Sequence, residues 1–109
     1  MPAIVDTAPP RTVTDVEYVL VTDEELERPY RVIIENDDVT PMDFVVMILL
    51  TVFELDFESA MEVMLNAHNK GRALVRTMPF EEAQQRVHTA QSLARQSGYP
   101  LSFYLEPDK

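Results

Sequence analysis

Several residue types are scarce or missing in this 109-residue chain, and each absence excludes something. There is no cysteine, so disulfide bonds, thiolate zinc sites and cysteine nucleophiles are excluded. Apolar runs are short: the longest, Phe44 to Leu50, falls well below the roughly 20 residues that a membrane-spanning helix needs. No basic segment followed by an apolar stretch opens the chain, so no secretory signal is expected. We therefore predict a cytoplasmic protein that is not inserted in a membrane.

Basic residues are also few. Nine lysines and arginines stand against nineteen aspartates and glutamates, for a formal net charge of −10. Because binding to phosphate requires a surplus of lysine and arginine, this charge argues against a nucleic-acid partner. It favours partners with cationic groups, since opposite charges steer encounter. A free α-amino group, with an ordinary pKa of about 7.7–8.0, is one such cation.

Catalytic motifs are missing as well. The chain contains no glycine-rich phosphate loop, no His-Glu-x-x-His pair and no Gly-x-Ser-x-Gly elbow. Two adjacent acids, Asp37 and Asp38, raise the possibility of a metal site, but no calcium-binding loop pattern follows them. His88 is expected on a helix surface. We predict a protein that is not an enzyme and holds no cofactor or metal.

Composition divides the chain in two. Residues 1–28 contain seven acids and two bases, a net charge of −5, together with three prolines. This pattern predicts a flexible, extended acidic arm, although the apolar stretch Val16 to Val21 could dock transiently. Residues 29–109 are predicted to form one folded domain.

The element pattern of that domain predicts strands over 30–35, 72–78 and 99–106. Helices are predicted from Pro41 to Phe53, from Asp56 to a closing Gly71, and from Glu81 to about Gly98. Thr40 is expected as the N-cap of the first helix, with Pro41 at its first helical position. The order β-α-α-β-α-β predicts an α+β two-layer sandwich, with a three-stranded antiparallel sheet and three helices on one face.

Two polar features could form a binding site. Asn36-Asp37-Asp38 ends the first strand, and as an isolated tripeptide it is more often a solvated turn. Its amide and carboxylate oxygens could instead accept charge-assisted hydrogen bonds from an ammonium group. His68 lies near the end of the second helix, one turn after Met64 on the same face. Methionines at this spacing usually belong to a core, yet they also line adaptable binding sites.

Three segments together resemble the ClpS adaptor family: Asn36-Asp37-Asp38-Val39-Thr40-Pro41-Met42-Asp43-Phe44-Val45, Met64-Leu65-Asn66-Ala67-His68-Asn69-Lys70-Gly71-Arg72-Ala73, and Pro100-Leu101 with Glu106. The resemblance covers about residues 29–107. It implies the same β-α-α-β-α-β fold. It also implies an adaptor that docks on the N-terminal domain of a Clp-type AAA+ unfoldase, usually ClpA, and delivers proteins that begin with Phe, Tyr, Trp or Leu.

The resemblance also assigns roles to residues. The α-amine of the substrate would be held by Asn36, Asp38 and His68, with Asp37 and Thr40 shaping the rim. The pocket for the first side chain would be walled by Met42, Val45, Met64, Ala67 and Leu101. Contacts to the unfoldase would include Glu81 and Arg86, and the N-terminal arm would enter the unfoldase pore.

Two positions depart from the family pattern. Ala67 stands where relatives commonly have valine or a larger residue, so the pocket is expected to be roomier, to favour bulky aromatic residues, and to reject branched residues less strongly. The first helix is unusually apolar at Met47, Leu50 and Thr51, so either the arm folds over it or the protein associates with itself through it. The alternative function is a regulatory module of the unfoldase that does not select N-terminal residues; a small metal-dependent enzyme is the weakest hypothesis.

Overall fold

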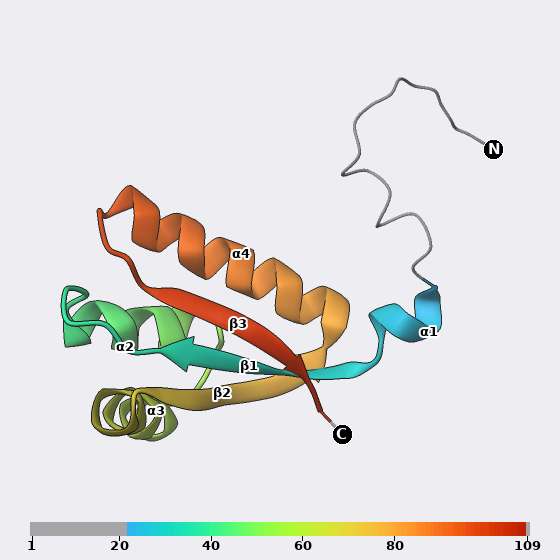
Figure 1. The fold of residues 1–109 in the computed structure, drawn as a ribbon, viewed down its shortest axis with the longest axis horizontal. Helices are drawn as coiled ribbons and strands as arrows, with labels where there is room; N and C mark the ends of the chain where they lie inside the picture. The colour runs from blue at the N-terminus through green and yellow to red at the C-terminus, as the bar shows by residue number, and fades with distance from the viewer. Residues whose placement is uncertain (1–21, 109) are drawn as a thin grey trace.

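The computed structural model describes residues 22–108 (Figure 1). Its elements are α1 (Asp23–Leu26), β1 (Pro29–Glu35), α2 (Met42–Thr51), α3 (Phe57–Lys70), β2 (Arg72–Pro79), α4 (Phe80–Gln96) and β3 (Ser102–Pro107). From β1 onward the order is the predicted β-α-α-β-α-β. No helix within residues 22–108 combines the length and the apolar character needed to cross a membrane.

The three strands form one antiparallel sheet in the order β2-β1-β3, which confirms the predicted sheet. The central strand β1 pairs Ile34 with Ala73 on one side and with Phe103 on the other. A bulge between Val32 and Ile33 shifts the register against β2. The middle residues of β1, Val32 to Ile34, are buried, and Val32 and Ile34 belong to the hydrophobic core.

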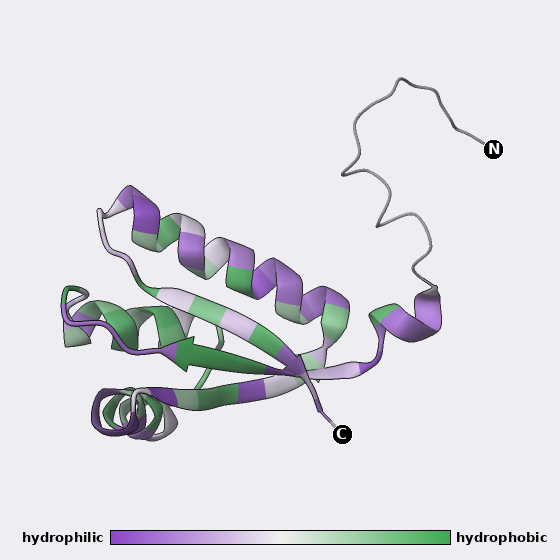
Figure 2. Cartoon of the chain, viewed as in Figure 1, coloured by the Kyte–Doolittle hydropathy of each residue, from purple (hydrophilic) through white to green (hydrophobic). Residues whose placement is uncertain are grey.

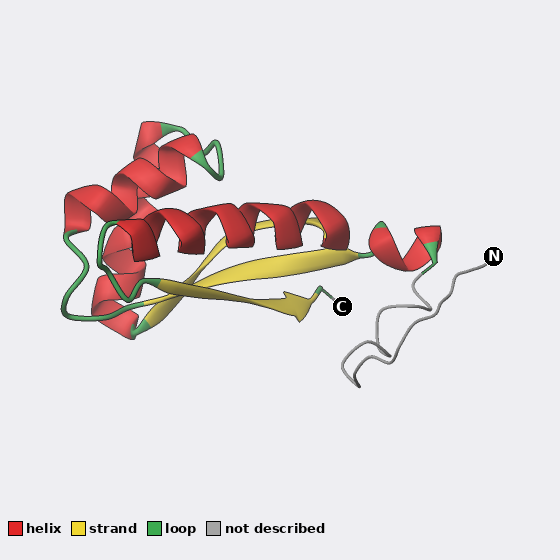
Figure 3. Cartoon of the chain, turned by 90° about the horizontal axis from the view of Figure 1, so that it is seen from above, coloured by secondary structure: helices red, strands yellow, loops and turns green. Residues whose placement is uncertain are grey.

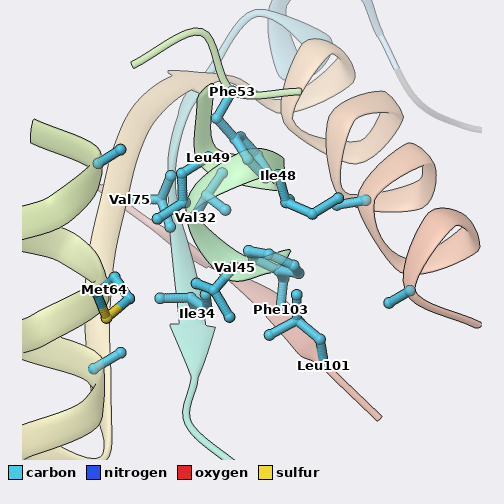
Figure 4. Packing of buried hydrophobic residues seen from close by; sticks show 14 of the residues in the cluster. Val32, Ile34, Val45, Ile48, Leu49, Phe53, Met64, Val75, Leu101 and Phe103 are labelled. Carbon is cyan, nitrogen blue, oxygen red and sulfur yellow. The ribbon is translucent and has the colours of Figure 1, made fainter. Parts of the chain in front are cut away.

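The helices cover the sheet and gather at one end of it. α4 runs along the sheet, whereas α2 and α3 lie at the end toward which β1 points (Figure 1), and the view from above shows the same arrangement (Figure 3). Colouring by hydropathy shows α2 as mostly apolar and α4 as mixed (Figure 2). α2 supplies the fully buried Ile48 and Leu49, which pack with Val32 of β1 and Phe53 in the core (Figure 4).

The predicted start of the first helix is wrong in one respect. Pro41 occupies the N-cap position, with extended backbone angles and no side-chain cap, and the helix begins at Met42. Thr40 does not cap the helix because its hydroxyl donates to the carboxylate of Asp37 at 2.9 Å. The helix also ends before Phe53, with Val52 as its C-cap, and Glu54 then adopts a positive φ of 58°.

The second helix begins and ends as predicted. The Asp56 carboxylate accepts the backbone N–H of Ser59 at 2.8 Å, which makes Asp56 the N-cap of α3. The side-chain and backbone hydrogen bonds with Ser59 lower the pKa of Asp56 below its ordinary value of 3.8. At the other end Gly71 is the C-cap, with a φ of 92° that favours glycine.

The last strand begins later than predicted. After α4 ends, the N–H of Tyr99 bonds to the carbonyl of Ala94 at 2.8 Å, and the Tyr99 ring meets Phe44 of α2 at a centroid distance of 4.8 Å. Tyr99 is therefore held against the helices, and β3 starts at Ser102 instead of residue 99.

The described part of the acidic arm also differs from the predicted extended chain. Residues 23–26 form the helical turn α1, which a capping box between Thr22 and Glu25 begins. Acidic side chains in a first turn are stabilised by the positive end of the helix dipole. Residues 1–21 of the arm, including Val16 to Val21, lie outside the described residues, so the predicted flexible arm and its entry into the unfoldase pore stay predictions.

Candidate functional site

A cavity of about 160 Å³ lies where β1 ends, between α2, α3 and the start of β3. Its walls come from three stretches of chain: the end of β1 with the following loop and the start of α2, the second half of α3, and the residue before β3. It is lined by Ile34, Glu35, Asn36, Asp37, Asp38, Thr40, Met42, Val45, Met64, Ala67, His68 and Leu101. All ten residues that the family resemblance assigned to amine binding and to the hydrophobic pocket thus border one cavity.

The floor of the cavity is apolar and closed. Val45, Met64, Ala67 and Leu101 each expose no more than 9% of their surface, and Ile34 exposes 1%. Figure 4 shows Met64 of α3 pointing toward Ile34 and Val45, with Leu101 beyond them. Met42, at the first position of α2, is 46% exposed and so belongs to the mouth. An apolar group that enters the cavity would therefore bury its surface away from water.

The loop that forms the rim is held by Asp37. One carboxylate oxygen accepts the backbone N–H groups of Val39 and Thr40, at 2.8 and 2.6 Å, and the other accepts the Thr40 hydroxyl. These bonds occupy the carboxylate within its own turn. Asp37 and Thr40 therefore fix the shape of this loop, and their part in substrate binding stays a prediction.

The other three polar rim residues have open side chains. The backbone N–H of Asn36 bonds to the carbonyl of Gly71 at 2.9 Å, which fastens the end of β1 to the end of α3, the helix that carries His68. Asn36, Asp38 and His68 are all exposed. Within the part of the chain that the structure describes, none of their side chains makes a hydrogen bond or an ion pair. These groups are available to a ligand.

The electrostatics of the rim favour a cation. The ionisable residues that line the cavity are Glu35, Asp37, Asp38 and His68, with no lysine or arginine among them. The Glu35 carboxylate accepts a hydrogen bond from the Ser102 hydroxyl at 3.0 Å, and Asp37 is bonded within its own turn. Asp38 is therefore the one lining carboxylate without a hydrogen-bond partner among the described residues. Residues 22–108 hold no group of three or more His, Cys, Asp or Glu side chains that could share a metal ion.

The sequence prediction missed two of the lining residues, Ile34 and Glu35. Ile34 forms part of the buried floor. Alternation along the first strand puts Val32 and Ile34 on one face, so this signal could have placed Ile34 beside the pocket. Glu35 is the last residue of that strand and borders the cavity directly before Asn36.

The two residues assigned to unfoldase binding lie elsewhere. Glu81 and Arg86 belong to the N-terminal half of α4 and do not line the cavity. Glu81 is exposed. Arg86 instead donates to the carbonyl of Val52 at 2.7 Å and pairs with Glu82 at 3.0 Å and Glu54 at 3.6 Å. Arg86 thus secures the C-terminal end of α2, a structural role that the sequence did not indicate.

The apolar first helix is only partly covered. Leu50 packs against the core, whereas Met47 stays 37% exposed and the Thr51 hydroxyl donates to the Met47 carbonyl at 2.8 Å. Self-association through this helix, or coverage by the arm, stays a prediction.

Comparison with known proteins identifies this combination of an α+β domain and a half-polar cavity. The model of the family "ATP-dependent Clp protease adaptor protein ClpS" matches residues 25–104. The Clp protease adapter protein ClpS of Desulforapulum autotrophicum is 43% identical over 79 residues, covering 72% of this chain and 76% of that protein. The ClpS 2 protein of Rhizobium meliloti is 38% identical over 97 residues, covering 87% and 96%.

A solved structure shows the same likeness in three dimensions. Agrobacterium tumefaciens ClpS2 bound to L-phenylalaninamide superposes with a TM-score of 0.72 at 34% identity, covering 75% of this chain and 99% of the other. The chain belongs to the ClpS family of Clp protease adaptors.

Proposed function

We propose that this adaptor binds proteins whose first residue is bulky and hydrophobic (Phe, Tyr, Trp or Leu) and delivers them to a Clp-type AAA+ unfoldase. The observation that carries the proposal is the cavity itself, which combines a buried apolar floor with hydrogen-bond acceptors on its rim that have no partner within residues 22–108. The ligand in the Agrobacterium structure, L-phenylalaninamide, has the two groups that such a cavity would read: a free α-amine and an aromatic side chain.

The rim is suited to the α-amine. A protonated amine has three N–H donors, and Asn36, Asp38 and His68 offer an amide oxygen, a carboxylate oxygen and a ring nitrogen. Bonds from an ammonium to a carboxylate are shorter and stronger than neutral ones. Since every unmodified N-terminus carries this amine, the rim would supply affinity without selecting a sequence.

The floor is suited to the first side chain. A cavity of about 150 Å³ in another protein accepts a benzene molecule, so about 160 Å³ accommodates a phenyl ring. Burying a Phe or Leu side chain contributes about 1.5–3 kcal/mol, enough to separate it from Ala or Ser by tens-fold. A charged first side chain would be rejected because nothing on the floor replaces its water.

Binding of a Phe-initiated peptide and of its N-acetylated twin, measured by fluorescence anisotropy, tests the proposal. Acetylation removes the charge of the amine, so the twin should bind at least tenfold more weakly. Equal affinity for the two peptides would contradict recognition of the α-amine. It would favour the alternative, a regulatory module that does not select N-terminal residues.

Two substitutions in the rim separate recognition from loop structure. Asp38→Asn should weaken binding of the Phe-initiated peptide about 10- to 150-fold, because a hydrogen bond to a charged group contributes about 1.5–3 kcal/mol. The melting temperature of the protein should change little. Asp37→Ala should weaken binding and also lower the melting temperature, because its carboxylate holds Val39 and Thr40. Glu62→Gln, on the exposed surface of α3, controls for the change in net charge. An equal loss in the Glu62 variant would show a nonspecific charge effect instead of a contact.

Docking on the N-terminal domain of a ClpA-type unfoldase is the second half of the proposal, and it places the adaptor in the cytoplasm with that partner. Glu81 is the better residue for testing this docking surface, because its carboxylate is exposed, whereas a change at Arg86 would also disturb the end of α2. Glu81→Lys should slow unfoldase-dependent degradation of a Phe-initiated reporter without changing peptide affinity. Unchanged degradation would remove Glu81 from the docking surface.

A further inference from the structure

A second hollow adjoins the cavity on the surface of α2 and α3. This groove is lined by Met42, Asp43, Val46, Phe57, Met61 and Met64, and only Asp43 among them is polar. It is open to solvent and measures about 400 Å³. The groove therefore has room for an apolar side chain.

Phe57 is the most exposed of these apolar residues. Its side chain is 64% exposed, although it occupies the first position of α3, where the capping role already belongs to Asp56. The helix would start equally well with a polar residue there, since the first turn faces water. Neither capping nor core packing accounts for an aromatic ring at this position, whereas contact with an apolar ligand does.

The groove lies next to the cavity and shares two lining residues with it. Met42 and Met64 line both hollows, so one pair of side chains forms the wall between them. A peptide whose first side chain fills the cavity must leave across its mouth, where Met42 is exposed. In an extended peptide the third side chain returns to the same face as the first, about 6.6 Å further along. The side chains that follow the first residue thus come within reach of the groove.

We propose that this groove is a second specificity site, which takes a bulky apolar side chain from the second or third residue of the bound N-terminal segment. The proposal rests on the proposed function, because the peptide is positioned by the cavity. The adaptor would then rank substrates by two apolar side chains: one buried deep in the cavity and one lying against Phe57 and Met61. An acidic side chain at the same positions would be disfavoured by Asp43.

The expected effect is modest because the groove is open on one side. A leucine that buries only part of its surface against Phe57 should tighten binding about three- to tenfold over alanine, less than full burial would. The gain should appear chiefly in the dissociation rate.

The test compares three peptides that differ only at positions two and three, Phe-Ala-Ala, Phe-Leu-Ala and Phe-Ala-Leu, each with the same uncharged tail. Their affinities are measured with the full-length protein, with Phe57→Ala, and with Leu65→Ala as the matched control. Leu65 is a 45% exposed apolar residue of the same helix that lines neither hollow. We expect one of the leucine peptides to bind at least threefold tighter, the gain to vanish in Phe57→Ala, and the gain to persist in Leu65→Ala.

Other results would overturn the inference. Binding of Phe-Ala-Ala without any gain from leucine would reject the groove while leaving the proposed function intact, as would a gain that survives in Phe57→Ala. Failure of Phe-Ala-Ala itself to bind would reject both. If Phe57→Ala lowers the sedimentation coefficient and leaves all three affinities unchanged, the groove is occupied by a second copy of the chain instead.

Discussion

The size of the cavity depends on Ala67, and Ala67→Val tests whether size sets the choice of first residue. Ala67 is 4% exposed and borders the cavity, so the two added methyl groups have no route to solvent. They must reduce a volume of about 160 Å³, which is close to what a phenyl ring needs. Trp is larger than Phe, so it has the least room to spare and its binding would be affected most.

The magnitude follows from the cost of overpacking. Adding methylene groups to a filled apolar site typically costs about 1–3 kcal/mol, which corresponds to about 5- to 150-fold in affinity. We expect Trp-initiated peptides to lose affinity near the upper end of this range, Phe near the middle, and Leu, which is flexible and smaller, by less than fivefold.

The assay is a competition series with peptides that begin Trp, Phe, Leu and Ile and are otherwise identical. The melting temperature of the variant is recorded in parallel, because a valine that unfolds α3 would weaken all four peptides equally. The reasoning is refuted if Trp and Leu lose the same factor, or if both aromatic peptides stay within twofold of the unaltered protein. In either case the residue at position 67 does not set the space for the first side chain.

Two further predictions concern the helix that carries His68. Gly71→Ala should lower the free energy of unfolding by about 1–2 kcal/mol, because alanine is strained at a φ of 92°; that corresponds to roughly 4–8 °C of melting temperature for each kcal/mol. Gly71→Asn should cost less, because asparagine tolerates a positive φ better than alanine does. Its larger size should not matter, since no atom lies within 4 Å of an added Cβ. A greater loss with asparagine would contradict the backbone explanation. At the other end, the lowered pKa of Asp56 stabilises the fold above the ordinary value of 3.8, and this contribution disappears as the pH falls through the folded-state pKa. Chemical denaturation from pH 7 to pH 2.5 should therefore show the unaltered protein losing more stability than Asp56→Asn, which caps without titrating; parallel curves would rule out this role.

Local signals in the sequence determined most of the secondary structure. Asp56 and Gly71 mark the ends of α3 because both act on backbone groups within a few residues, through a hydrogen bond to Ser59 and a positive φ. The β-branched stretch at the first predicted strand formed a strand for a similarly local reason. At Thr40 two local signals competed, a helix N-cap and the turn of Asp37, and the prediction of an N-cap was wrong. The Thr40 hydroxyl donates to the Asp37 carboxylate and does not cap the helix.

The cavity, by contrast, depends on contacts between residues far apart in the chain. Asn36 and His68 are 32 positions apart and come together because the Asn36 N–H reaches the carbonyl of Gly71. Leu101 borders the same cavity as Val45 and Met64 although it lies far from them along the chain, in the link between α4 and β3. Family resemblance assigned these residues to one site, but residue patterns alone left Asn36-Asp37-Asp38 as a turn and His68 as a helix-end histidine.

The sequence by itself therefore determined the elements, their order and the acidic character of the chain, since each depends on neighbouring residues or on composition. Tertiary structure decided which polar groups remain open and which are engaged. Asp37 is occupied by its own turn and Arg86 by the end of α2, whereas Asp38 has no partner within residues 22–108. It also decided that an exposed Phe57 lies beside the cavity. Such distinctions depend on the distance between side chains in space, and no spacing along the chain encodes that distance directly.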